Sequence, residues 1–145
     1  MPPRALKRSL IMQWLGLCAA LTVLSSPSQA AQRPIDYSKV TKADRGFVYE
    51  RAVRYVVVAD DPCLTIQYLK LGDPGELLRE KAICSLGGAT FDRDFALVDF
   101  RTVEFFEDRL DVEVEFIPSR RGRKAIRWCT IDLKPDLIGD LKCVR

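Results

Sequence analysis

The first thirty residues constrain this chain more than any other feature, because they have the pattern of a secretion signal. Residues 1–8 contain three basic and no acidic side chains, residues 10–24 are almost entirely apolar, and Ser28 and Ala30 are small residues where a signal peptidase recognises its substrate. The apolar run is too short to span a bilayer as a helix, which needs about 20 residues. We therefore expect cleavage near Ala30 and a protein that is periplasmic or secreted, not transmembrane.

Removing this leader (residues 1–30) also changes the charge balance. The whole chain has 23 basic and 20 acidic residues, and three of the cations lie in the leader, so residues 31–145 carry equal numbers of each sign. A nucleic-acid-binding protein normally carries an excess of positive charge, so we expect no nucleic-acid partner. The remaining length suits one domain. We expect an extended arm over residues 31–45 and a single globular domain over residues 46–145.

Four cysteines follow the leader: Cys63, Cys84, Cys129 and Cys143. An even set in an oxidising compartment predicts two disulfides. A zinc site is the alternative, but the spacings include no Cys-x-x-Cys pair and the chain has no histidine. Of the three possible pairings, Cys63–Cys84 with Cys129–Cys143 is favoured because each bond then closes a short loop. Each bond would stabilise the fold by about 3 kcal/mol.

The first half of the domain gives mixed signals. Residues 54–59 are rich in β-branched side chains and predict a strand, while residues 50–53 are compatible with a helix, so residues 46–60 stay ambiguous. Residues 64–71 predict a second short strand. Asp73, Pro74 and Glu76 form the pattern of a helix start, which predicts a short helix over residues 76–84 that ends before Gly87-Gly88.

The second half predicts an antiparallel meander. Residues 95–106 form a strand with a bulge, and residues 110–117 alternate apolar and acidic side chains. Arg120-Arg121-Gly122 suits a three-residue hairpin loop with Gly122 in the left-handed conformation. That register places Trp128 and Ile126 on the core face and Cys129 on the outer face beside Glu113. The expected fold is a small disulfide-stabilised α+β domain with one short helix.

Few residues suggest catalysis. Without histidine, Ser–His and Cys–His catalytic pairs cannot form. Aspartates in predicted loops could act as acid and base, but such residues are also common turn formers: Asp60, Asp61, Asp92 and Asp94. Asp92 and Asp94 could also help to bind calcium, although the glycine and the distal glutamate of an EF-hand loop are absent. We expect no enzyme activity, no metal and no cofactor.

The predicted hairpin tip carries the one local concentration of charge in the mature chain. It consists of Arg120, Arg121, Arg123 and Lys124. Such a cluster could bind an anionic partner, either an envelope or host component or an acidic protein. The alternative is a solvated loop that protects a sheet edge from aggregation.

The chain resembles the VirK family of exported proteins of plant-associated bacteria. The resemblance rests on an apolar strand that ends in Asp and Cys over residues 54–63, on Gly88 before a strand region, and on the turn at Arg121-Gly122. Residues 131–135 (Ile-Asp-Leu-Lys-Pro) and the terminal Cys143 continue it. The resemblance implies a protein produced with bacterial virulence functions, best known alongside crown gall tumour induction. The family has no assigned reaction or catalytic residues to carry over.

Three functions remain open from the sequence. The preferred one is an exported, non-enzymatic, virulence-associated protein that acts through surface contacts. The second is a periplasmic inhibitor or immunity protein that blocks a hydrolase or toxin with a protruding loop. The third is a hydrolase that depends on Asp92 and Asp94.

Overall fold

Almost every described residue belongs to a β-strand or to a tight turn. The computed structural model describes residues 34–72 and 75–144, so the leader and the Asp73-Pro74 helix start lie outside the described residues. After a short 3-10 turn (Tyr37–Lys39), the strands are β1 (Val40–Val48), β2 (Arg51–Val58), β3 (Leu64–Leu69), β4 (Leu77–Ile83), β5 (Ser85–Leu86), β6 (Ala89–Thr90), β7 (Phe95–Phe105), β8 (Arg109–Pro118), β9 (Ala125–Lys134) and β10 (Leu137–Cys143). One helical turn, α1 (Phe91–Asp94), precedes β7.

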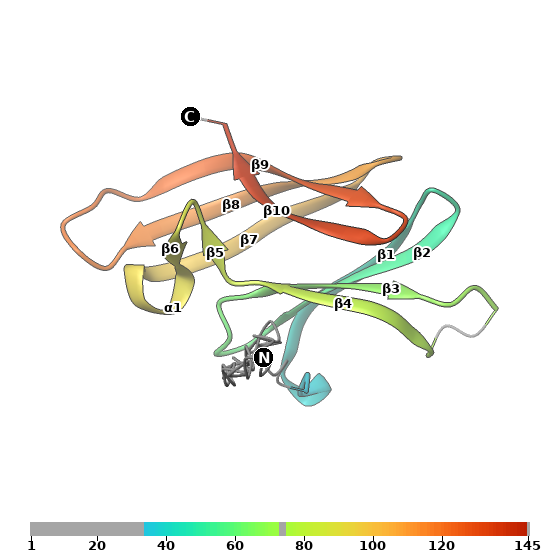
Figure 1. Cartoon of the computed structure of the whole chain (residues 1–145). Helices are drawn as coiled ribbons and strands as arrows, with labels where there is room; N and C mark the ends of the chain where they lie inside the picture. The colour runs from blue at the N-terminus through green and yellow to red at the C-terminus, as the bar shows by residue number, and fades with distance from the viewer. Residues whose placement is uncertain (1–33, 73–74, 145) are drawn as a thin grey trace, which may run out of the picture. The chain divides into compact units, whose positions relative to one another are not determined.

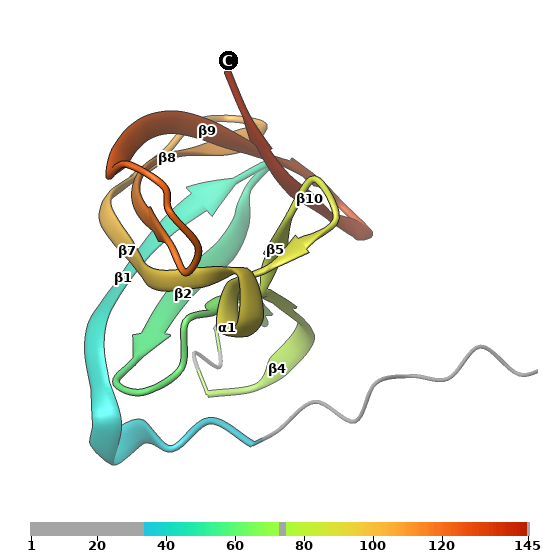
Figure 2. The same cartoon turned by 90° about the vertical axis from the view of Figure 1, so that its left-hand side faces the viewer.

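Two antiparallel meanders build the domain (Figure 1). The first sheet has the order β1-β2-β3-β4, the second sheet has the order β10-β9-β8-β7, and β5 and β6 form a small hairpin between them. Figure 2 views the same strands along a perpendicular direction. The inner faces of both sheets contribute to one hydrophobic core, as in a β-sandwich. The described residues belong to one compact unit.

The core residues come from alternate positions of the central strands. The largest fully buried side chains of this core are Tyr68, Phe91, Phe100, Leu64, Ile66, Leu110, Ile131, Leu133 and Ile138. Tyr68 crosses from the first sheet to the second, where its hydroxyl donates to the backbone oxygen of Lys134 at 2.8 Å and lies 3.2 Å from the backbone oxygen of Leu137. Burial raises the pKa of this hydroxyl. A buried phenol thus finds the polar partners that burial requires.

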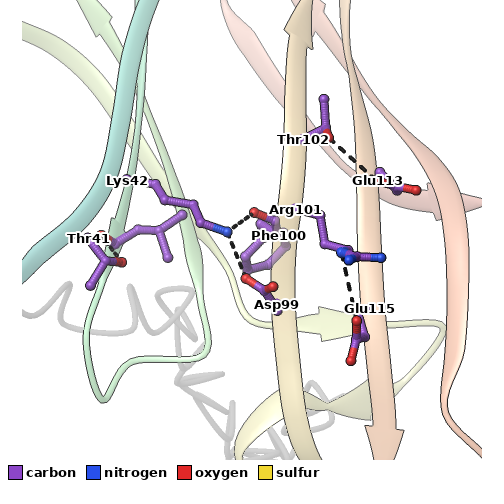
Figure 3. Close-up of polar contacts among 9 residues, drawn as sticks. Thr41, Lys42, Asp99, Phe100, Arg101, Thr102, Glu113 and Glu115 are labelled. Carbon is purple, nitrogen blue, oxygen red and sulfur yellow. Dashed lines mark hydrogen bonds and ion pairs between the residues drawn. The ribbon is translucent and has the colours of Figure 1, made fainter.

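Two lysines join the sheets along their edges. At one edge Lys42 of β1 donates from Nζ to Asp99 Oδ1 and to the backbone oxygen of Phe100 on β7, both at 2.8 Å (Figure 3). At the opposite edge Lys81 of β4 donates to the backbone oxygens of Ile138 and Gly139, both at 3.0 Å, and it also contacts Asp140 Oδ1 at 2.7 Å. β10 is bulged between Ile138 and Leu141. Each lysine therefore gives a hydrogen-bond donor to backbone oxygens at a sheet edge, which would otherwise be free to pair with a strand of another chain.

Both disulfides lie within the meanders. The structure joins Cys63, just before β3, to Cys84, just after β4, and it joins Cys129 of β9 to Cys143 of β10. This is the pairing that short loops favour. The predicted environment of one cysteine was wrong, however, because Cys129 is 1 % exposed and belongs to the core face.

The predicted helix over residues 76–84 was wrong, because this segment forms β4. All six residues of β3 are buried, and its outer backbone edge needs hydrogen-bond partners. β4 supplies them in antiparallel register, from Leu64 opposite Ile83 to Leu69 opposite Leu77. A helix of this length has little stability of its own. The backbone pairing with β3 therefore determines that this segment is a strand. Gly87 and Gly88, expected to end the helix, instead form the β5–β6 turn with φ of +56° and +87°.

The ambiguous residues 46–60 form a hairpin and not a helix. Tyr49 and Glu50 make its turn with φ of +49° and +59°, which suits a two-residue hairpin loop. The predicted strand at residues 54–59 is therefore the end of the longer β2. The predicted arm over residues 31–45 also ends earlier, because β1 begins at Val40 and pairs with β2 from that residue onward.

The predicted strands of the second half are present, but the β8–β9 register differs by one residue. Glu115 faces Ile126 and Val112 faces Cys129, so Cys129, Ile131 and Leu133 form the core face of β9. A slip of one residue moves every side chain to the other face. This register buries Cys129, Ile131 and Leu133, which are also paired with β10. The free energy gained by burying these three residues outweighs what burial of Trp128 and Ile126 would contribute. The bulges of β7 lie between Phe95 and Leu97 and between Phe100 and Thr102.

The fold is thus β-rich and not clearly α+β. The C-terminal meander and the two disulfides match the expectation, whereas the one α-helix among the described residues is a single turn at residues 91–94 and not the predicted segment. A second meander at the N-terminal side is the element that the sequence pattern did not predict.

We predict that replacing Cys63 and Cys84 together with alanine lowers the free energy of unfolding by about 3 kcal/mol, because the unfolded chain gains loop entropy. Replacing Cys129 and Cys143 should cost at least as much, since Cys129 is also buried in the core. Urea unfolding followed by circular dichroism measures both. A loss under about 1 kcal/mol for either pair would contradict the structural role of that bond.

We predict that Lys81→Met lowers the free energy of unfolding by about 1–2 kcal/mol, because two β10 carbonyls lose a charged donor. The ion pair with the exposed Asp140 should add little. Lys134→Met is the matched control, because Lys134 is exposed and makes no ion pair among the described residues. Equal unfolding midpoints for the two variants would show that the edge contact does not stabilise the sandwich.

Acid should weaken the β9–β10 region. A hydrogen bond from Lys142 lowers the pKa of Asp132, and one from Lys81 lowers the pKa of Asp140. A carboxyl with a lowered pKa in the folded state stabilises the protein above its unfolded value of about 4, and this contribution is lost as the pH falls through the folded value. We predict a loss of stability below about pH 4 that is smaller in the Asp132→Asn, Asp140→Asn double variant. Unfolding midpoints across this pH range test it, and an unchanged slope in the variant would contradict it.

Candidate functional site

The basic cluster predicted from the sequence lies in the loop between β8 and β9. The last paired residues are Phe116 and Ala125, so the connection is longer than the predicted three residues. Its four cationic side chains are all exposed: Arg120, Arg121, Arg123 and Lys124. We call these four residues the basic tip. The structure therefore brings the predicted partner-binding residues together on one exposed loop.

The base of this loop is anchored to the core through α1. Phe91 is 1 % exposed and its ring lies 6.1 Å from the rings of both Phe100 and Phe116. The backbone N–H of Ser119 donates to the backbone oxygen of Asp94 at 3.0 Å, which joins the loop to α1. Figures 1 and 2 both show α1 beside this loop. The basic tip is therefore carried by a rigid base, and its four side chains are exposed to solvent.

An open hollow lies between α1 and the loop. It has a volume of about 520 Å³ and is lined by Arg93, Asp94, Pro118 and Arg120. Asp94 is already engaged, because its Oδ2 accepts from the backbone N–H of Thr90 at 2.7 Å. Arg93 is partly engaged as well, because its Nε donates to Thr90 Oγ1 at 3.0 Å. Two arginines and one carboxylate thus line the hollow, and an anion could enter from the solvent side.

The cations of the basic tip differ in how far they are already paired. Lys124 Nζ contacts Glu115 Oε1 at 2.8 Å, and Arg101 approaches the other oxygen of the same carboxylate at 3.8 Å (Figure 3 shows Arg101 and Glu115). Within residues 34–72 and 75–144, the guanidinium groups of Arg120, Arg121 and Arg123 make no ion pair. The loop thus offers three arginines whose charges are not neutralised by a neighbour.

The loop backbone corrects one expectation about the turn. Arg121, and not Gly122, has a positive φ, at +26°. Gly122 is required for another reason: a Cβ at this position would lie 2.4 Å from the Pro118 ring. A charge-removing variant at position 121 should therefore use asparagine, which tolerates a positive φ better than alanine does.

Three of the four loop aspartates considered from the sequence take part in turns or in local hydrogen bonds. Asp94 accepts from Thr90, and Asp61 Oδ1 accepts from the backbone N–H of Cys63 at 3.0 Å. Asp60 has a φ of +64° in the turn after β2. In the described part of the chain, no group of three or more Cys, Asp or Glu side chains could hold a metal ion. These contacts support turn formation for these residues.

Sequence reasoning placed Trp128 and Ile126 in the core, but they lie on the outer face of the second sheet. Trp128 is 51 % exposed and Ile126 is 44 % exposed. The signal that could have revealed this is the alternation of Cys129, Ile131 and Leu133, which continues the apolar face further than Ile126 and Trp128 do.

Comparisons of the chain with protein-family models, with curated proteins and with solved structures found no match. The resemblance to the VirK family accordingly stays a prediction. Among the described residues, no helix has the length and apolar character needed to cross a membrane.

Proposed function

We propose that this protein is an exported, non-enzymatic binding protein whose basic tip contacts an anionic partner. The observation that carries the proposal is the set of three unpaired, exposed arginines on a loop with a rigid base. The mature chain has equal numbers of acidic and basic residues, so its net charge gives no general affinity for anions. The local cluster instead attracts an anionic partner to one part of the surface.

Two further observations support the proposed location of the protein and its proposed role in virulence. Two disulfides fit a protein that works outside the cytoplasm. The resemblance of residues 46–143 to the VirK family adds a role in virulence toward a plant host. In this proposal, the protein acts in the periplasm or outside the cell, and its partner is an anionic envelope or host component.

A second candidate is an inhibitor or immunity protein that inserts the loop into an enzyme or toxin. It is favoured by the constrained loop backbone, where Arg121 has a positive φ and Gly122 lies against Pro118. A loop fixed before binding loses less conformational entropy on association. In this case the partner would be a protein with an acidic cleft.

We predict that the triple variant Arg120→Ala, Arg121→Asn, Arg123→Ala binds fluorescent poly-L-glutamate about tenfold more weakly than the unaltered protein at low salt, because three exposed charge pairs are lost. Added salt should weaken the unaltered protein more than the variant, since screening acts on those same pairs. Fluorescence anisotropy measures both effects.

The matched control removes three exposed cations elsewhere, with Lys39→Ala, Arg45→Ala and Lys134→Ala. It changes the net charge by the same amount but leaves the basic tip intact. If this control loses as much affinity as the tip variant, binding depends on net charge, and the proposed role of the loop is wrong.

A further inference from the structure

A strip of exposed apolar side chains runs along the outer face of the second sheet, close to its free edge. It consists of Ile126, Trp128 and Val144, which are 44 %, 51 % and 74 % exposed. The backbone N–H of Val144 donates to the backbone oxygen of Trp128 at 3.2 Å, so Val144 lies beside Trp128 as a continuation of β10. We call these three residues the Trp128 strip.

Hydrogen-bonding groups lie directly beside the indole ring. Glu113 of β8 is the cross-strand partner of Trp128, and Thr102 of β7 is the partner of Glu113. Thr102 Oγ1 contacts Glu113 Oε2 at 3.4 Å, as Figure 3 shows. Thr130 follows Trp128 on the same face of β9, with Asp111 opposite it. An aromatic surface is thus bordered by carboxylates and hydroxyls.

The strip continues from the basic tip along one strand. Side chains two residues apart on a strand share a face, so Ile126 and Trp128 point to the same side of β9. At about 3.4 Å per residue, Trp128 lies about 10 Å along the strand from Ala125, the first residue after the loop. One extended ligand could therefore contact the arginines of the basic tip and the indole ring together.

The neighbours of the ring decide which anionic ligand fits. A membrane surface would bury Glu113, whose carboxylate makes no ion pair among the described residues and contacts only the Thr102 hydroxyl in Figure 3. Taking such a carboxylate out of water carries a large free-energy penalty. A polysaccharide would offset part of this penalty, because sugar hydroxyls can donate hydrogen bonds to the carboxylate in place of water. The apolar face of a sugar ring can also cover the indole, which is a large apolar surface with a polar edge.

We propose that the basic tip and the Trp128 strip together bind an acidic polysaccharide. A sugar ring stacks on Trp128, its hydroxyls donate to Glu113, and the carboxylates of the neighbouring sugars pair with Arg120, Arg121 and Arg123. The inference rests on the proposed function, because the basic tip supplies the contacts to the charges. The partner class that it adds is a polymer of sugar acids.

The test uses two probes that share a charge but differ in their rings. The probes are alginate oligomers, which are built of sugar acids, and poly-L-glutamate, which has carboxylates without sugar rings. The protein is used as it is recovered from an exporting host, with its N-terminus checked by mass spectrometry. The sequence has tryptophan only at positions 14 and 128, so after removal of the leader the tryptophan emission, excited selectively over the four tyrosines, reports on Trp128 alone.

We predict that alginate oligomers change the emission of Trp128 and that poly-L-glutamate does not. Trp128→Ala should weaken alginate binding about tenfold, which corresponds to the contribution of a stacked ring, and leave poly-L-glutamate binding unchanged. Trp128→Phe should keep most of the alginate affinity, since it preserves an aromatic face. Phe47→Ala is the matched control, because Phe47 is an aromatic residue of the first sheet that is 62 % exposed.

Several results would overturn the inference. These are alginate binding without any change of Trp128 emission, equal alginate affinity of Trp128→Ala and the unaltered protein, or binding of Trp128→Phe as weak as that of Trp128→Ala. Binding to anionic lipid vesicles that depends on Trp128 would assign the strip to a membrane surface and would also overturn it. If the triple variant of the basic tip retains full poly-L-glutamate affinity, the proposed function fails instead, so the two failures can be distinguished.

Discussion

Burial of the inner faces of two antiparallel sheets against each other is the interaction on which the rest of this structure depends. A single four-stranded sheet with one bare apolar face would expose more apolar surface than its hydrogen bonds could offset. Here each meander covers the other, and Tyr68 crosses the core to reach backbone oxygens of the opposite sheet. Backbone oxygens at the sheet edges still need hydrogen-bond donors, and Lys42 and Lys81 supply them with their charged amino groups.

The same core explains how a charged loop can be presented to solvent in a defined place. Phe91 lies among the aromatic rings of the core, and Asp94, at the end of the helical turn that begins with Phe91, accepts a backbone hydrogen bond from Ser119 at the base of the loop. Burial of apolar side chains holds the base of the loop in place. The arginines of the basic tip are therefore positioned by the backbone and need no partner within the molecule. A surface of this kind can be altered at its charged positions with little effect on the fold.

The second half of the chain was largely predictable, and the first half was not. The regular alternation over residues 110–117 identified β8 because one face of that strand is apolar and the other is acidic. Residues 77–83 carry no such alternation, and their two leucines are exposed, so local helix-start signals dominated the prediction. The demand that made them a strand is the unpaired backbone edge of β3, which no local pattern reveals.

The candidate site divides in the same way. The four cations of the basic tip lie within five consecutive residues, so their clustering required no knowledge of the fold. The exposure of Trp128 depended on the β8–β9 register, which the loop length and the apolar positions shared with β10 decide together. A register error of one residue placed this ring in the core and hid the surface that it forms with Glu113.

The amino-acid sequence by itself determined the leader pattern, the even set of cysteines and the charged loop, because each depends on residues that are close along the chain or on simple counts. Tertiary structure alone decided the second meander, the face on which Cys129 and Trp128 lie, and the lysine contacts between the sheet edges. These features depend on which backbone edges and apolar faces remain unsatisfied after the neighbouring strands have paired, and that is a property of the assembled sheets.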